Sequence, residues 1–158
     1  MSGPTPDVSP AEGPQWWYGG HMEVKVRAED TGGALGVAEG LFTYKGYGPP
    51  LHVHSREDET ICVLEGQIRF RVGDDEFVAG PGTCVWQPRG VPQAFSVESE
   101  SARALIIFTP GGIERMFEDG GVPVAESAEP PAQPQPDADT MAALATQLGF
   151  EFVGPRLG

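Results

Sequence analysis

The chain has 158 residues, of which 21% are charged and 39% hydrophobic, with a formal net charge of −13. This length suffices for one domain with a full core. The acidic balance disfavours nucleic acid and anionic membrane, which require basic patches, and a solvated surface is enough to explain it.

The N-terminal residues, 1–14, are rich in proline, glycine, serine and acidic residues, so we expect a disordered arm. This stretch lacks the basic start and the apolar segment of a secretory signal. The longest apolar run, Ala104–Phe108, is too short to span a bilayer. We therefore expect a cytoplasmic protein that contacts no membrane.

The only two cysteines are Cys62 and Cys84. They show no Cys-x-x-Cys spacing and no histidine at zinc-finger distance. A disulfide between them remains an open alternative. Because the expected compartment is reducing, we expect buried free thiols instead.

Three aromatic residues, Trp16, Trp17 and Tyr18, precede the first expected strand. We expect them to cover the apolar surface of the domain or of a partner subunit rather than to touch a ligand. His21, the first of the three histidines in the chain, is expected at the surface.

Residues 15–119 consist of short segments of alternating apolar and polar residues, separated by turns rich in glycine, proline and acidic residues. Many short strands at even spacing predict an all-β fold, a small barrel or jelly roll. The predicted strands are Met22–Arg27, Ala34–Tyr44, the strand carrying His52 and His54, the strand carrying Glu59, Ile68–Val72, Glu76–Ala79, Thr83–Gln87, Gln93–Glu98 and Arg103–Thr109.

After a short helix predicted at Ile113–Glu118, residues 120–136 form a proline-rich linker in which we expect neither strand nor helix. Residues 137–158 should form a C-terminal helix and tail. Asp137 or Asp139 can cap this helix, predicted at Thr140–Leu148, and Gly149 can end it. Its apolar stripe is expected to dock on the exterior of the barrel and consists of Met141, Leu144, Ala145 and Leu148.

The stretch Gly46–Gly66 contains the residues with the clearest chemical pattern. Alternate residues of a strand share a face, so His52 and His54 lie side by side. If the turn after them folds the next strand back, the carboxylate of Glu59 converges with the two imidazoles. That set can bind a divalent metal and leave positions open for water or substrate. Two further acids in the turn, Glu57 and Asp58, are expected to be solvated.

The spacing of this stretch resembles the first conserved motif of the cupin superfamily: glycine, five residues, His-x-His, four residues, glutamate, six residues, glycine. Gly82, Pro88 and Gly90, followed by Gln93, resemble the second conserved motif of the same superfamily. At the position of Gln93 the family usually has a histidine. The resemblance covers roughly residues 20–110. It implies that residues 15–119 form a small cupin β-barrel with a C-terminal helical extension.

The resemblance implies the metal ligands His52, His54, Glu59 and Gln93, and a divalent ion such as Ni, Fe, Mn, Co or Zn. For Gln93, direct coordination, a supporting role beside three ligands, and loss of the metal remain alternatives. Glu59 is also the expected catalytic group, because a carboxylate tuned by the ion and a barrel of low dielectric can take a proton from the substrate.

The runs HVHSREDET, PRGVPQAF and TPGGIERMF resemble single-domain bacterial cupins related to quercetin 2,3-dioxygenase, which implies a dioxygenase acting on a phenolic or enolisable aromatic molecule. The resemblance also leaves a non-oxidative polyketide cyclase or isomerase, and a non-catalytic small-molecule-binding cupin, as alternatives. A homodimer is expected. The aromatic residues expected to line the substrate pocket are Phe42, Tyr44, Phe70, Trp86 and Phe95.

Overall fold

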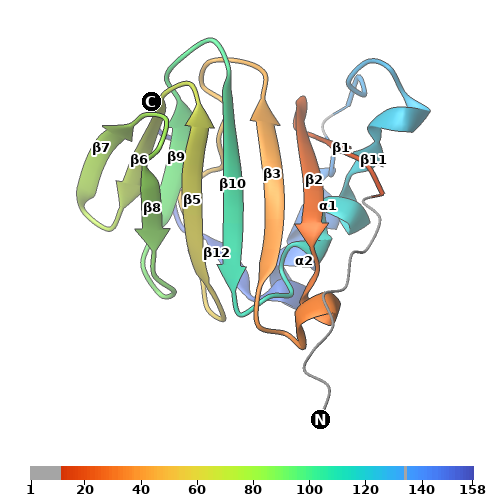
Figure 1. Cartoon of the computed structure of the whole chain (residues 1–158), viewed down its shortest axis with the longest axis horizontal. Helices are drawn as coiled ribbons and strands as arrows, with labels where there is room; N and C mark the ends of the chain where they lie inside the picture. Colours follow the sequence, from red (N-terminus) through yellow and green to blue (C-terminus); the bar gives the residue numbers. More distant parts are fainter. Residues whose placement is uncertain (1–11, 134) are drawn as a thin grey trace.

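Two antiparallel sheets form the body of the protein (Figure 1), and the computed structural model describes residues 12–133 and 135–158. The larger sheet has seven strands in the order β11 (Val122–Pro123), β1 (Gln15–Trp17), β2 (Gly20–Val26), β3 (Gly36–Phe42), β10 (Ala102–Thr109), β5 (Asp58–Glu65) and β8 (Cys84–Gln87). The smaller has five, in the order β12 (Phe150–Phe152), β4 (His52–His54), β9 (Gln93–Val97), β6 (Ile68–Val72) and β7 (Asp75–Ala79).

The apolar core lies between the two sheets because alternate residues of each strand face inward. In β10, Ala102, Ala104, Ile106 and Phe108 are buried and their neighbours are more exposed. Opposite them, Ile68 and Phe70 of β6 are fully buried. The all-β class and the C-terminal helix predicted from the sequence are confirmed. In the described part of the chain, no helix has the length and apolar character needed to cross a bilayer.

The prediction for the linker needs correction. The expected linker, 120–136, contains the short strand β11, which pairs with β1, and a 3₁₀ helix at Val124–Glu126. Proline is tolerated there because β11 lies at the edge of its sheet. The turn expected after the first predicted strand is present as a 3₁₀ helix, Ala28–Thr31, which ends at Gly32 in the left-handed conformation. The predicted disordered arm, 1–14, falls almost entirely outside the described residues.

The C-terminal helix α2 (Ala138–Leu148) ends as predicted and begins two residues before the predicted Thr140, capped by Asp137, one of the two expected caps. The side chain of Asp137 accepts a hydrogen bond from the backbone N–H of Thr140 at 2.8 Å, and Gly149 ends the helix in the left-handed conformation. Leu144 and Leu148 are buried. The helix packs against α1 (Arg115–Gly120) and β12. The chain then forms β12, an edge strand that pairs with the histidine strand β4 and that the sequence did not reveal.

The predicted free thiols are wrong, because Cys62 and Cys84 form a disulfide. The two residues lie directly opposite each other on β5 and β8, with their Cα atoms 4.0 Å apart. Cys62 alternates with the buried residues Ile61 and Val63, so its side chain faces outward. The disulfide therefore links the edge strand β8 to the sheet from outside the barrel.

A buried carboxylate fixes the start of α1. Glu114 accepts hydrogen bonds from the backbone N–H groups of Ala28 at 2.7 Å and Gly112 at 2.6 Å. A Cβ atom at Gly36 would overlap this carboxylate. Glycine is thus required in β3 where the side chain of Glu114 lies against the backbone.

Replacing Glu114 by alanine should lower the free energy of unfolding by about 2–3 kcal/mol, since two backbone N–H groups would lose their acceptor. Urea unfolding of Glu114→Ala measures the loss. The matched control, Glu100→Ala, removes an exposed carboxylate and should be nearly neutral. Equal stability of both variants would contradict the anchoring role.

Protein unfolded without reductant should expose no reactive thiol, because both cysteines are in the disulfide. Reduction should lower stability by about 3 kcal/mol, as expected from the loss of a cross-link that closes a loop of this length. Thiol titration in denaturant, with and without prior reduction, tests both cysteines. Two free thiols in the unreduced protein would refute the pairing.

Candidate functional site

Three buried polar side chains meet inside the barrel. His52 and His54 come from β4 in the smaller sheet, and Glu59 comes from β5 in the larger one. Each offers one ligand atom, and these atoms all lie within 4.8 Å of one another. The sequence predicted this convergence through a strand folded back on β4. Instead, β4 and β5 belong to different sheets, and the three side chains meet across the interior.

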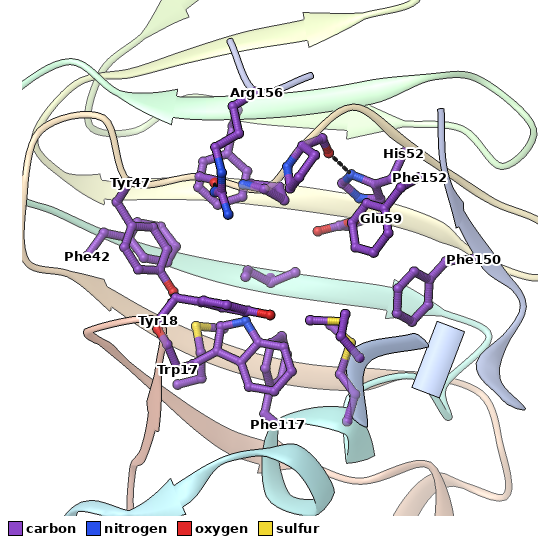
Figure 2. A pocket seen from close by; sticks show the side chains of 18 of the residues that line it. Trp17, Tyr18, Phe42, Tyr47, His52, Glu59, Phe117, Phe150, Phe152 and Arg156 are labelled. Carbon is purple, nitrogen blue, oxygen red and sulfur yellow. Dashed lines mark hydrogen bonds between the residues drawn. The ribbon is translucent and has the colours of Figure 1, made fainter. Parts of the chain in front are cut away.

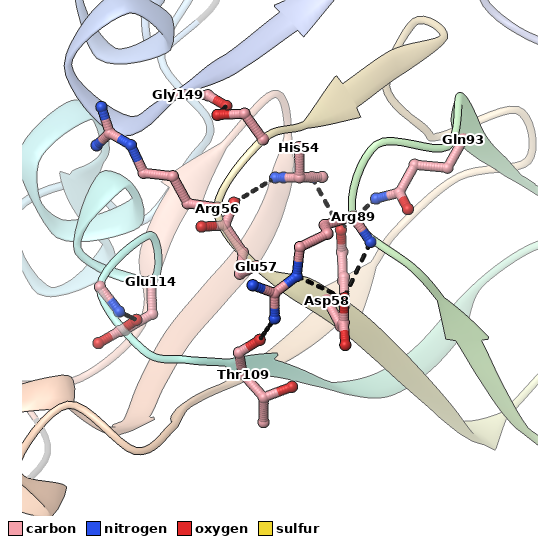
Figure 3. Close-up of polar contacts among 12 residues, drawn as sticks. His54, Arg56, Glu57, Asp58, Arg89, Gln93, Thr109, Glu114 and Gly149 are labelled. Atoms are coloured by element: carbon pink, nitrogen blue, oxygen red, sulfur yellow. Dashed lines mark hydrogen bonds and ion pairs between the residues drawn. The ribbon is translucent and has the colours of Figure 1, made fainter.

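The backbone and one carboxylate orient the two imidazoles. Nδ1–H of His52 donates to the carbonyl oxygen of Pro50 at 2.8 Å (Figure 2). Nδ1–H of His54 donates to Oε1 of Glu57 at 2.7 Å (Figure 3). The second ring nitrogen, Nε2, is therefore the atom that each histidine can offer as a metal ligand. A carboxylate behind a histidine raises the basicity of the ring and fixes its orientation.

The expectation that Glu57 is solvated is wrong, because Glu57 is buried against His54. Its neighbour Asp58 points elsewhere and accepts hydrogen bonds at 3.0 Å from both the backbone N–H and Nε of Arg89 (Figure 3). The Arg89 contacts hold the pKa of Asp58 below its usual value. The two adjacent turn acids thus have different roles, and Glu57 is a site residue that sequence reasoning missed.

Gln93 is buried beside Glu59 and donates a hydrogen bond from Nε2 to Oε2 of Glu59 at 2.6 Å. The same oxygen lies 3.1 Å from Nε2 of His54. The structure thus places all four predicted ligand residues together. Direct coordination by Gln93 remains a prediction, and the contact present is a hydrogen bond that fixes the Glu59 carboxylate.

Neighbouring groups oppose the effect of burial on the pKa values of His54 and Glu59. Burial alone would lower the pKa of His54, but the carboxylates of Glu57 and Glu59 outweigh it and raise the pKa to about 9. Burial alone would raise the pKa of Glu59, but His54, His52 and Gln93 hold it below its usual value. Burial lowers the pKa of His52, and the neighbouring charge of His54 adds to this effect.

This donor set fits a divalent cation. Nε2 of His54 is buried and is not aligned for a hydrogen bond with any group in the described residues. Two neutral imidazole nitrogens and one carboxylate oxygen are ligands that Fe, Ni, Co, Mn and Zn ions accept. A cation would take the place of the proton on His54 and would remove the cost of leaving that nitrogen without a partner.

The three residues lie in the wall of a cavity of about 410 Å³ (Figure 2). Of the aromatic residues predicted to line it, Phe42, Tyr44 and Phe95 do so. Phe70 lies instead in the closed core, fully buried, and Trp86 is 62% exposed at the surface of β8. Neither is among the lining residues.

Most of the remaining apolar lining comes from segments outside the central strands. Trp17 and Tyr18 line the cavity, so the expectation that these aromatics only cover apolar surface is incomplete. Trp16, by contrast, packs its ring at 4.4 Å from that of His21, away from this cavity. The lining residues that sequence reasoning missed include Tyr47, Phe117, Met141, Phe150, Phe152 and Arg156.

Comparisons with known proteins match the central part of this chain. Residues 41–108 match the Cupin_2 family, described as a cupin domain. Quercetin 2,3-dioxygenase of Bacillus subtilis (strain 168) is 26% identical over 87 residues, which are 55% of this chain and 26% of that protein. The match therefore spans about a quarter of the length of this curated relative.

Solved structures share the fold. A predicted oxalate decarboxylase from Thermotoga maritima is 16% identical with a TM-score of 0.57, covering 67% of this chain and 98% of that chain. KdgF from Halomonas sp. is 17% identical with a TM-score of 0.54, covering 67% and 84% of the two chains. At these identities the likeness concerns the fold alone.

Protein purified without chelator should hold about one divalent ion per chain, and His52→Ala or Glu59→Ala should remove it. Glu57→Gln should weaken metal binding by about 10–100-fold, since it removes the carboxylate that orients His54. Elemental analysis and metal titration measure both effects.

The matched control is Asp58→Asn, which neutralises the adjacent carboxylate that binds Arg89. It should keep the ion. Full metal occupancy in both His52→Ala and Glu59→Ala would exclude this ligand set.

Proposed function

Because the chain is a member of the cupin superfamily, we propose that it is a metal-dependent enzyme acting on a phenolic or enolisable aromatic small molecule, as a quercetinase-like dioxygenase. The observation that carries this proposal is the cluster of His52, His54 and Glu59 in the wall of an aromatic cavity. The homodimer and the cytoplasmic location predicted from the sequence remain predictions.

His52, His54 and Glu59 would hold the ion, with Gln93 beside them. A divalent ion at this position would polarise the oxygen of a bound phenol or enol and lower the pKa of that oxygen. The metals compatible with this donor set are Ni, Fe, Mn, Co and Zn.

Glu59 is the group that accepts the substrate proton. Its ionised form is favoured by His54 and by the hydrogen bond from Gln93, although the carboxylate is buried. The Gln93 contact also restricts the carboxylate to one orientation. Proton transfer to a positioned side chain of this kind contributes about 10²–10⁴-fold to a rate.

The cavity walls position a flat substrate. Phe42 and Tyr47 stack with ring centroids 4.8 Å apart, and Phe95 lies 5.2 Å from Phe42. These rings offer apolar faces on which an aromatic ring can stack or pack edge to face. A substrate held this way would exclude water from Glu59.

A non-oxidative cyclase or isomerase is the second candidate, and the observation that favours it is Gln93. At the position where the family usually has a histidine, this chain places an amide that binds the Glu59 carboxylate. Glu59 could then take a proton from carbon and return it elsewhere on the same molecule. The net reaction closes a ring or shifts a double bond without consuming oxygen.

Oxygen consumption with quercetin distinguishes these candidates. We expect the metal-loaded protein to consume oxygen, and we expect Glu59→Gln to lower kcat by about 100-fold or more. Mass spectrometry of the product shows whether oxygen atoms have been added.

Turnover to a product of unchanged mass, with no oxygen consumed, would overturn the dioxygenase in favour of the cyclase or isomerase. Metal-loaded protein that binds phenolic compounds without turning them over would leave a non-catalytic binding cupin.

A further inference from the structure

The C-terminal tail brings an arginine to the cavity. Beyond β12, Val153 N–H donates to the Leu51 carbonyl at 2.8 Å, and Leu51 N–H donates to the Pro155 carbonyl at 3.0 Å. The tail therefore follows the loop that leads into β4. Arg156 comes next, donates from Nη1 to the carbonyl oxygen of Gly48, and lines the cavity.

The loop that holds Arg156 is fixed in place. The backbone N–H of Val97 donates to the Tyr47 carbonyl at 2.9 Å, and the backbone N–H of Gly46 donates to the Val97 carbonyl at 2.8 Å. A Cβ atom on Gly48 would overlap the carbonyl oxygen of Phe95. The Gly48 carbonyl that accepts the hydrogen bond from Arg156 is thus anchored against β9. Only Nη1 of Arg156 takes part in this bond, so the other N–H groups of the guanidinium are not used by it.

The charge of Arg156 is not neutralised by a carboxylate within residues 12–133 and 135–158. Of the ten Lys and Arg residues in the chain, six form ion pairs there. Arg156 forms none, and it is the only Lys or Arg among the residues that line this cavity. An unneutralised guanidinium beside apolar aromatic walls favours an anion.

Figure 2 shows Arg156 reaching toward the cavity between Tyr47 and His52, with the ring of Tyr18 below it. Tyr18 adopts φ 51°, a left-handed conformation that is costly for a residue with a side chain. Burial raises the pKa of the Tyr18 hydroxyl, and the positive charge of Arg156 opposes that shift. Tyr18 therefore keeps its proton and can donate a hydrogen bond in the same region.

We propose that Arg156 is a specificity residue that binds an anionic group of the substrate where the cavity opens to solvent. The substrate class is then a flat aromatic molecule with a carboxylate or ionised phenol, its ring against the aromatic walls. This inference rests on the proposed function for the identity of the ligand as substrate. Binding of the anion itself requires neither metal nor turnover.

Two fluorescent probes of one aromatic skeleton test this assignment. 1-Anilinonaphthalene-8-sulfonate is anionic, and N-phenyl-1-naphthylamine is its neutral counterpart. In Arg156→Gln, we expect binding of the anionic probe to weaken about 10-fold and binding of the neutral probe to stay within about two-fold. Arg156→Lys should retain part of the affinity for the anionic probe.

The matched control is Arg56→Gln. Arg56 also donates to a backbone carbonyl, that of Gln147, and forms no ion pair in the described residues, but it does not line the cavity. This control should leave both probes unchanged. Met141→Trp, which fills the cavity, should weaken both probes and so locate them there.

Unchanged binding of the anionic probe in Arg156→Gln would overturn the proposal, as would failure of the wild-type protein to bind it. Equal loss of both probes would also overturn it, because Arg156 would then only hold the tail. The titration is repeated in His52→Ala. Persistent dependence on Arg156 in this variant, which should lack the ion, would show that the anion site does not need the metal. If the metal-loaded wild-type protein shows the same dependence but turns over no aromatic substrate, the anion site stands while the enzymatic proposal fails.

Discussion

The crossing of the chain from one sheet to the other between β4 and β5 is the constraint on which the site depends. The two strands are neighbours in sequence but belong to different sheets, so their inward faces lie opposite each other across the interior. His52 and His54 occupy one inward face and Glu59 the other. A shift of one residue in either strand would turn its ligands away from the cavity.

Burying these groups would be costly if they were unpaired, and the surrounding residues show how that cost is met. Pro50 and Glu57 each accept a hydrogen bond from an imidazole, and Gln93 donates one to the carboxylate. These partners fix the orientation of every ligand group before any ion arrives. Among the buried atoms of these ligands, Nε2 of His54, which faces Glu59, has no aligned hydrogen-bond partner in the part of the chain that the structure describes, as a metal site requires.

Sequence reasoning found the parts of the fold that follow from periodicity. The alternation in β5 and β10, the motif spacing from Gly46 to Gly66, and the cap at Asp137 each depend on local rules. It missed features that depend on tertiary placement. A strand of three residues such as β12 has no readable alternation, and nothing local shows that Glu57 turns inward or that Trp86 lies on the outer face of an edge strand.

The segments beyond the matched family region, 41–108, contribute much of the cavity wall, so they are where this chain can differ in substrate from its relatives. The central claim nevertheless concerns the three ligands. Anomalous diffraction from crystals grown with cobalt or zinc tests it most directly. The account predicts one strong peak at about 2.0–2.2 Å from Nε2 of His52, Nε2 of His54 and a carboxylate oxygen of Glu59. No peak there, or a peak bound only by surface groups, would contradict it.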